Sequence, residues 1–218
     1  MSMAKTAPFE KYAAEYDQWF VKNDSIYLSE LQALQSLLPQ GARGLEVGVG
    51  SGRFAFSLDI GTGIEPAEGL ARIARNRGIT VYRNVAEQLP FGDAEFDFVL
   101  FVTVICFLDD VEKAFREACR VLKNNGSIIV GFLDKTSSLG RAYQQRQNRS
   151  TFMKDARLYK TDEVASYLKK TGFTDCVFKQ TLFSEKNTRI EPVRNGFGQG
   201  AFVVVKARKG AYCSDRAM

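Results

Sequence analysis

A glycine-rich stretch at residues 44–53, GLEVGVGSGR, limits the possible folds more than any other part of the chain. It begins as an apolar strand and continues into a turn that contains Gly48, Gly50 and Gly52. Because glycine has no Cβ, such a turn can bend sharply and its backbone can approach a ligand closely. A helix that begins after the turn would present free N–H groups and its positive dipole end to an anionic or polar ligand. The stretch therefore predicts a strand, a ligand-binding turn and a helix in succession.

Strands and amphipathic helices alternate beyond this turn. Near-continuous apolar runs such as 96–102 are typical of strands buried on both faces of a parallel sheet. Two later strands, 175–183 and 201–207, have no helix between them, which indicates an antiparallel pair. The pattern predicts an α/β, Rossmann-like fold, a seven-stranded mostly parallel sheet with helices on both faces and an antiparallel C-terminal strand. The parallel strands are expected at 44–49, 59–64, 79–82, 96–102 and 127–133.

The composition excludes several classes of function. At 45% hydrophobic and 25% charged residues the chain is an ordinary globular protein. No apolar run is long enough for a transmembrane helix and no apolar signal core is evident, so we expect a cytoplasmic protein that does not bind a membrane. The net charge is +5, but the basic residues are scattered and lack interleaved aromatic residues. Nucleic acid is therefore not expected as a partner.

Two absences narrow the chemistry further. The chain has no histidine, and none of its four cysteines are spaced as C-x-x-C. These absences exclude Ser-His-Asp and Cys-His catalysis and most catalytic zinc sites, and no metal is expected. Cys119 and Cys176 lie in apolar patterns and are expected to be packed thiols.

Three features follow successive strands and should meet at one edge of the sheet: the glycine turn, Glu65, and the pair Ala86 and Glu87. Ligands of open α/β sheets bind at this edge. A carboxylate there can accept both ribose hydroxyls, and a loop there can face an adenine. A dinucleotide site would need a small residue where Arg53 stands, which argues against a pyrophosphate. The site is therefore expected to bind an adenosine-containing ligand.

These segments resemble class I S-adenosylmethionine-dependent methyltransferases of the small-molecule, type 11-like group. The resemblance covers residues 9–207 and implies one methyltransferase domain over 1–218. Its parts would be a helical cap (1–40), a cofactor-binding core (41–134), a substrate-side insertion (135–160) and a C-terminal helix and strand pair (161–208). The matching motifs are EVGVGSG (46–52), GIEP (63–66), AEQLPF (86–91) with FDFV (96–99), ACRVLKNNG (118–126) and YDQWF (16–20).

The resemblance implies S-adenosylmethionine as cofactor, S-adenosylhomocysteine as product and in-line methyl transfer to a small-molecule acceptor, helped mainly by proximity and orientation. Glu65 would bind the ribose, Thr103 would lie near the methionine part and the acceptor, and Arg53 would meet the methionine carboxylate. Val85 stands where many relatives have aspartate. The implied cofactor-binding residues are Tyr16, Glu46, Gly48, Val49, Gly50, Gly52, Arg53, Glu65, Pro66, Ala86, Glu87 and Thr103.

The activated methyl group makes a general base unnecessary, and Asp134 and Glu191 are the candidates if one acts. We expect the acceptor pocket to form between the aromatic N-terminal helix, the 135–158 insertion and the 184–200 loop. Two other functions stay open on the sequence: a noncatalytic nucleoside-binding protein with this fold and an NAD-dependent oxidoreductase.

Overall fold

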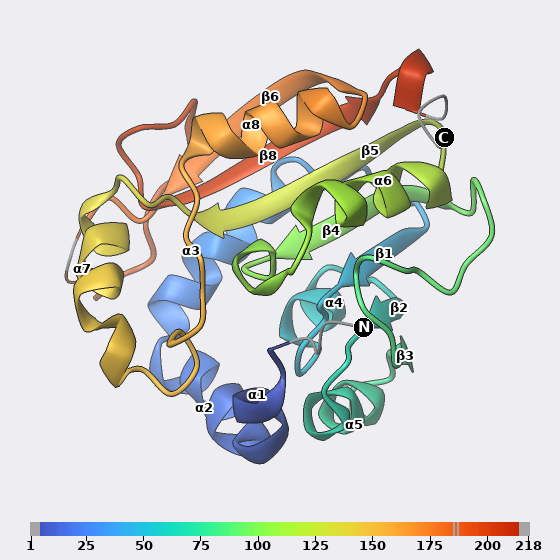
Figure 1. Cartoon of the computed structure of the whole chain (residues 1–218). Coiled ribbons are helices and arrows are strands. Elements are labelled where there is room, and N and C mark those ends of the chain that lie inside the picture. Colours follow the sequence, from blue (N-terminus) through green and yellow to red (C-terminus); the bar gives the residue numbers. More distant parts are fainter. Residues whose placement is uncertain (1–4, 185, 187, 214–218) are drawn as a thin grey trace.

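The structure, a computed structural model, describes residues 5–184, 186 and 188–213. The strands in this part of the chain are β1 (Gly44–Val47), β2 (Thr62–Ile64), β3 (Thr80–Tyr82), β4 (Phe96–Val102), β5 (Leu122–Leu133), β6 (Phe173–Thr181), β7 (Arg194–Asn195) and β8 (Phe202–Lys209). They form one sheet in the order β3-β2-β1-β4-β5-β8-β6-β7 (Figure 1). The first five strands are parallel, β8 is antiparallel to both its neighbours, and β7 is antiparallel to β6.

Helices cover both faces of this sheet, which confirms the predicted α/β class (Figure 1). They are α1 (Ala7–Lys11), α2 (Ala13–Lys22), α3 (Asp24–Gln35), α4 (Arg53–Ser57), α5 (Glu68–Asn76), α6 (Val111–Val121), α7 (Ser138–Arg146) and α8 (Thr161–Lys170), with 3-10 turns η1 (Ile105–Phe107), η2 (Gln147–Arg149) and η3 (Ala211–Cys213). One core lies under α6 and α8, and the other under α3, α4 and α5. Side chains of β4 alternate between them, with Phe101 in the first core and Leu100 in the second.

Two segments that are far apart in the sequence, the N-terminal helices and residues 135–158, lie in contact. Phe152, in the loop after η2, packs against Phe9 of α1 and Tyr16 of α2, with ring centroids 5.5 and 5.4 Å apart. The N-terminal helices and the 135–158 segment therefore meet over the carboxyl ends of the parallel strands. None of the helices in the described part of the chain is both long and apolar enough to cross a lipid bilayer.

The structure differs from the sequence prediction in three elements. The expected N-terminal helix is broken at Tyr12, whose ψ of 36° ends α1 before α2 begins. The sheet has an eighth strand, β7, which has only two exposed residues and so carries no apolar alternation. β5 begins at Leu122 and not at residue 127 as expected, and Asn125 within it has a left-handed φ of 66°.

The cysteine prediction is wrong for both residues. Cys119 of α6 forms a disulfide with Cys213 of η3 across 94 positions, so it is buried but not a free thiol. Cys176 is exposed on β6, within the run of exposed residues 174–177. The apolar pattern of the sequence could not reveal the disulfide or the exposure of Cys176, because both depend on which distant residues pack against these cysteines.

Candidate active site

The glycine-rich turn after β1 is held in conformations that favour glycine. The φ angles are +73° at Gly48, +56° at Gly50 and +83° at Gly52. A Cβ on Gly48 would lie 2.3 Å from a methyl carbon of Val104, and one on Gly52 would lie 2.6 Å from the Ile79 side chain. Any other residue at these two positions would adopt a disfavoured backbone conformation and displace packed neighbours.

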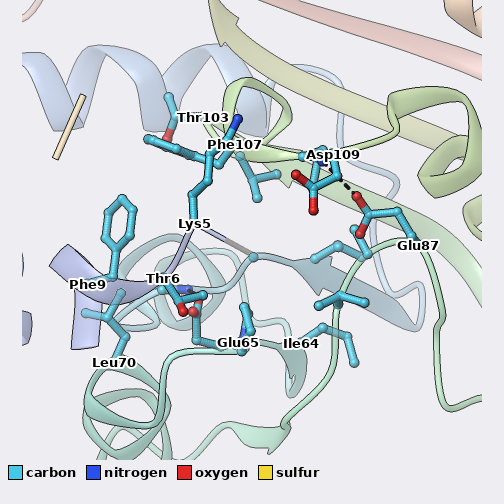
Figure 2. Close-up of a pocket in the computed structure, with 18 of the residues that line it drawn as sticks. Lys5, Thr6, Phe9, Ile64, Glu65, Leu70, Glu87, Thr103, Phe107 and Asp109 are labelled. Carbon is cyan, nitrogen blue, oxygen red and sulfur yellow. Dashed lines mark hydrogen bonds between the residues drawn. The ribbon is translucent and has the colours of Figure 1, made fainter. Parts of the chain in front are cut away.

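A cavity of about 350 Å³, the donor cavity, opens beside this turn at the carboxyl ends of β1, β2 and β4. Figure 2 shows Glu65 on one side of it, Thr103 on the opposite side and Glu87 at one end. A Cβ on Gly50 would contact the Tyr16 ring at 3.4 Å, so Tyr16 covers the turn at this point. The structure brings together at this cavity Tyr16, Gly48, Gly50, Glu65, Pro66, Ala86, Glu87 and Thr103 from the expected set.

Glu65 is the best-defined polar group of the donor cavity. It ends β2 with 6% of its surface exposed. One carboxylate oxygen accepts from the Gly50 N–H at 3.0 Å and the other from the Ala67 N–H at 2.9 Å. Burial raises the pKa of Glu65 to about 7, although these two backbone bonds lower it. Each oxygen keeps a lone pair for a further donor, so the carboxylate is oriented to bind two neighbouring hydroxyl groups.

Four of the expected cofactor residues lie outside the lining of the donor cavity: Glu46, Val49, Gly52 and Arg53. Glu46 is buried within β1, and one of its oxygens has no hydrogen-bond partner among the described residues. Burial raises the pKa of Glu46 well above its usual range, with the nearby Glu65 charge adding to the shift. Val49 packs against Gly63, where a Cβ would come within 2.7 Å of it.

Arg53 faces the helical cap instead of the cavity. Its Nε and Nη2 donate to the two carboxylate oxygens of Asp17 at 2.8 and 2.9 Å. Arg77 donates to the same carboxylate at 2.8 Å. Burial raises the pKa of Asp17, but the bonds from both arginines outweigh it and hold the pKa below its usual range. Arg53 and Asp17 therefore form a clamp that fastens α2 to α4, and the contact between Arg53 and a methionine carboxylate stays a prediction.

Glu87 closes one end of the donor cavity. Its Oε1 accepts from the backbone N–H groups of Asp109 and Asp110 at 3.0 and 3.2 Å. Asp110 in turn caps α6 through the Lys113 N–H at 2.9 Å. The loop after β3 is thus tied to the start of α6, and Ala86 is held buried beside it. In Figure 2 the bond from Asp109 to Glu87 is drawn at this end of the cavity.

A second cavity of about 210 Å³, the inner cavity, adjoins the donor cavity. Four residues line both cavities: Phe9, Tyr16, Thr103 and Phe107. Thr103 adopts a φ of +50°, a rare conformation for a β-branched residue, directly after β4. The rest of the inner lining comes from Trp19, Phe20, Ile26, Glu30, Phe54, Ile105, Cys106, Phe132, Leu133, Leu139, Tyr143, Ser150, Phe152, Met153, Leu158, Tyr159 and Leu182.

The expected acceptor elements meet at the inner cavity only in part. The N-terminal helices and the 135–158 segment line it, as the sequence indicated, but none of the described residues of the 184–200 loop does. Helix α3 contributes instead, through Ile26 and Glu30. Glu30 is 8% exposed, and burial raises its pKa to about 8.

Asp134 and Glu191 are not placed to act as a general base, because neither lines the donor cavity or the inner cavity. The Asp134 carboxylate accepts from the backbone N–H and the hydroxyl of both Thr136 and Thr161, which fastens the end of β5 to the start of α8. The Glu191 carboxylate accepts from the Phe183 N–H at 2.7 Å and from the Ser184 N–H at 3.2 Å. Both acids close backbone turns.

Known proteins resemble this chain over nearly its whole length. A family model described as a methyltransferase domain matches residues 45–130. A solved S-adenosylmethionine-dependent methyltransferase of Thermotoga maritima, named a possible histamine N-methyltransferase, is 48% identical with a TM-score of 0.91 and covers 94% of this chain and 99% of its own. An uncharacterized protein of Methanocaldococcus jannaschii is 45% identical over 92% of this chain and 98% of its own length. Malonyl-[acyl-carrier protein] O-methyltransferase of Geobacter sulfurreducens is 31% identical over 76% and 68%.

This chain belongs to the S-adenosylmethionine-dependent methyltransferase family. The family implies S-adenosylmethionine as methyl donor, and the donor cavity fits that molecule. Gly50 lines this cavity, and its N–H holds one oxygen of Glu65. Glu65 keeps lone pairs for a ribose, and Ile64, Leu70 and Ala86 offer an apolar wall for a purine.

Sequence reasoning missed two groups of this methyltransferase site. Lys5 and Thr6, which precede α1, line the donor cavity; in Figure 2 Thr6 is drawn next to Glu65, and Lys5 extends toward Phe107. Glu30 lines the inner cavity from α3. Lys5 and Thr6 carry no motif, but Glu30 carried a signal, because it interrupts the apolar stripe of its own helix at Tyr27, Leu31 and Leu34.

Proposed function

We propose that this protein is an enzyme that transfers the methyl group of S-adenosylmethionine from the donor cavity to a small molecule in the inner cavity. The observation that carries the proposal is the shared boundary of the two cavities at Tyr16 and Thr103. At about 210 Å³ the inner cavity is smaller than most drug-sized pockets, which favours a compact acceptor.

The residues of the chain would bind, align and exclude water. S-adenosylmethionine supplies a methyl group already activated by its sulfonium. Glu65 and the turn at Gly48 and Gly50 would hold the donor, while Phe9 and Phe107 would keep solvent from the boundary. Alignment of two bound reactants can supply up to roughly 7–11 kcal/mol of the barrier lowering. The strained Thr103 backbone supports a positioning role at this boundary.

The first test is calorimetric titration with S-adenosylmethionine and S-adenosylhomocysteine. We expect both to bind, and Glu65→Ala to weaken binding at least tenfold, because two hydrogen bonds to a carboxylate are lost. Glu68→Ala is the control, because Glu68 of α5 is half-buried, pairs with Arg75 and does not line the donor cavity. Absence of binding to well-folded protein would contradict the proposal.

Turnover separates the remaining alternatives. Formation of S-adenosylhomocysteine with a panel of small acceptors would support an enzyme. Binding without turnover across that panel would favour a noncatalytic nucleoside-binding protein, and quenching or shift of NADH fluorescence on titration would favour an oxidoreductase. The relatives named above differ in the acceptor their names give: one is named a possible histamine N-methyltransferase and the other a malonyl-[acyl-carrier protein] O-methyltransferase. Acceptor identity therefore has to come from the inner cavity itself.

A further inference from the structure

The inner cavity has an unusual charge distribution. Glu30 is the one acidic residue of its lining, and among the described residues no lysine or arginine lines it. No hydrogen bond within the described part of the chain reaches the Glu30 carboxylate, and burial is the sole cause of its raised pKa. An uncompensated buried carboxylate is costly, and a structure retains one mainly where a ligand or proton neutralises it.

The rest of the lining suits a cation with an apolar body. Trp19, Tyr143, Phe152 and Tyr159 present aromatic rings to the same space. Aromatic faces attract cations, tryptophan most strongly, and the attraction grows when water is excluded. The same rings would cover the hydrocarbon part of a small ligand. An anionic ligand would meet the Glu30 charge with no cation to offset it.

Glu30 and Tyr16 line the same inner cavity, and Tyr16 also lines the donor cavity. The charge of Glu30 raises the pKa of Tyr143 after the larger effect of burial. It also adds to the raised pKa of Tyr16, after burial and the larger effects of Glu65, Glu46 and Cys106. A nitrogen bound at Glu30 would therefore occupy the cavity that shares Tyr16 and Thr103 with the donor cavity.

We propose that Glu30 recognises the methyl acceptor and that the acceptor is a small amine with an apolar or aromatic body, which makes the reaction an N-methylation. This inference rests on the proposed methyltransferase function. The ammonium group of the acceptor gives one proton to the Glu30 carboxylate. The freed nitrogen lone pair then forms the new N–C bond, while the C–S bond breaks and its electron pair goes to sulfur. The product is a methylated ammonium and S-adenosylhomocysteine, and the Glu30 proton passes to solvent when the product leaves.

Glu30 is the group of the inner lining that changes charge near neutral pH. Tyr16, Tyr143 and Tyr159 have pKa values raised by burial, and burial raises the pKa of Cys106 to about 12. These four side chains are therefore neutral throughout the range in which Glu30 titrates. Amine binding should strengthen as Glu30 ionises around pH 8 and weaken once the amine itself loses its proton.

The test uses phenethylamine and tryptamine, with phenethyl alcohol and 3-phenylpropionate as matched neutral and anionic probes. Binding to the full chain saturated with S-adenosylhomocysteine is measured by calorimetry. We expect the amines to bind and Glu30→Gln to weaken them about 10- to 100-fold, as loss of a bond to a charged group does. Phenethyl alcohol should bind the wild type and Glu30→Gln with equal affinity. The control variant Glu15→Gln, at an exposed position on α2, should bind the amines as tightly as the wild type does. Turnover should give the N-methyl product, identified by mass.

Two results would overturn the inference. Equal amine affinity in the wild type and Glu30→Gln would show that the carboxylate does not recognise the acceptor. Absence of amine binding, or tighter binding of 3-phenylpropionate, would exclude this acceptor class. In each case normal binding of S-adenosylhomocysteine leaves the proposed methyltransferase function standing, whereas its loss in the wild type contradicts that function instead.

Discussion

At the scale of single residues, Glu30 should make stability depend on pH. Burial raises its pKa to about 8 in the folded protein, against about 4.3 in an unfolded chain. Between these values the folded state binds more protons, so the free energy of unfolding falls as pH rises. Glu30→Gln removes the titrating carboxyl group, so the variant lacks this fall in the free energy of unfolding. In urea unfolding, the variant should gain on the wild type progressively from about pH 5 to pH 8, by up to roughly 3–5 kcal/mol.

Glu15→Gln provides the baseline for this comparison, because Glu15 is exposed on α2. The raised pKa of Glu65 also affects the wild type, but it is common to both proteins and cancels in the difference. A difference between Glu30→Gln and the wild type that stays constant across this pH range would show that Glu30 does not titrate as the buried site requires.

The same scale shows what sequence could predict about the site. The position of Glu65 at the cavity was predictable, because strand ends are visible in the apolar pattern and ligands bind at that edge of the sheet. The position of Arg53 outside the cavity lining was not, because it is set by Asp17, which lies 36 positions away and binds the guanidinium. Asp134 and Glu191 lie outside both linings for a similar reason, since backbone donors that no pattern reveals bind their oxygens.

At the scale of elements, Asp17 should hold α2 on the sheet. Its carboxylate accepts from Arg53 on α4 and from Arg77 just after α5, and its side chain is 18% exposed. Asp17→Asn leaves two partly buried guanidinium groups with a weaker acceptor, which should lower the free energy of unfolding by about 1–3 kcal/mol. S-adenosylhomocysteine affinity should also fall, because Tyr16 on the same helix lines the donor cavity. Urea unfolding and calorimetry measure both effects.

Glu15→Gln again serves as control, and an Asp17→Asn protein as stable as that control would show that the clamp contributes nothing to stability.

Elements with long apolar runs, such as β4 at Phe96–Val102, were predictable to the residue. The two-residue β7 and the break between α1 and α2 were not, because tertiary contacts and a single backbone angle decide them.

At the scale of the whole molecule, two cavities share one boundary because three separate segments converge on it. The glycine turn follows β1, Thr103 follows β4, and the cap with the 135–158 segment closes over both. The carboxyl edge of the parallel strands was predictable as the place of binding. The lining of the inner cavity was only partly predictable, since α3 contributes to it and the described residues of the 184–200 loop do not.

The C-terminal end of the described chain is fastened to the fold by the Cys119–Cys213 disulfide, which closes a loop of 94 positions. Chain-entropy arguments give a stabilisation of about 4–5 kcal/mol for a loop of this length. Cys213→Ser should therefore lower the melting temperature without reductant, and dithiothreitol should bring the wild type to the same value. Cys176→Ser, at the exposed free thiol, is the matched control and should change neither melting temperature.

Counting reactive thiols tests the same bond directly. In denaturant, two thiols of the wild type should react before reduction and four after it. Four reactive thiols in the unreduced wild type would contradict the bond and would agree with the reducing, cytoplasmic environment expected from the sequence.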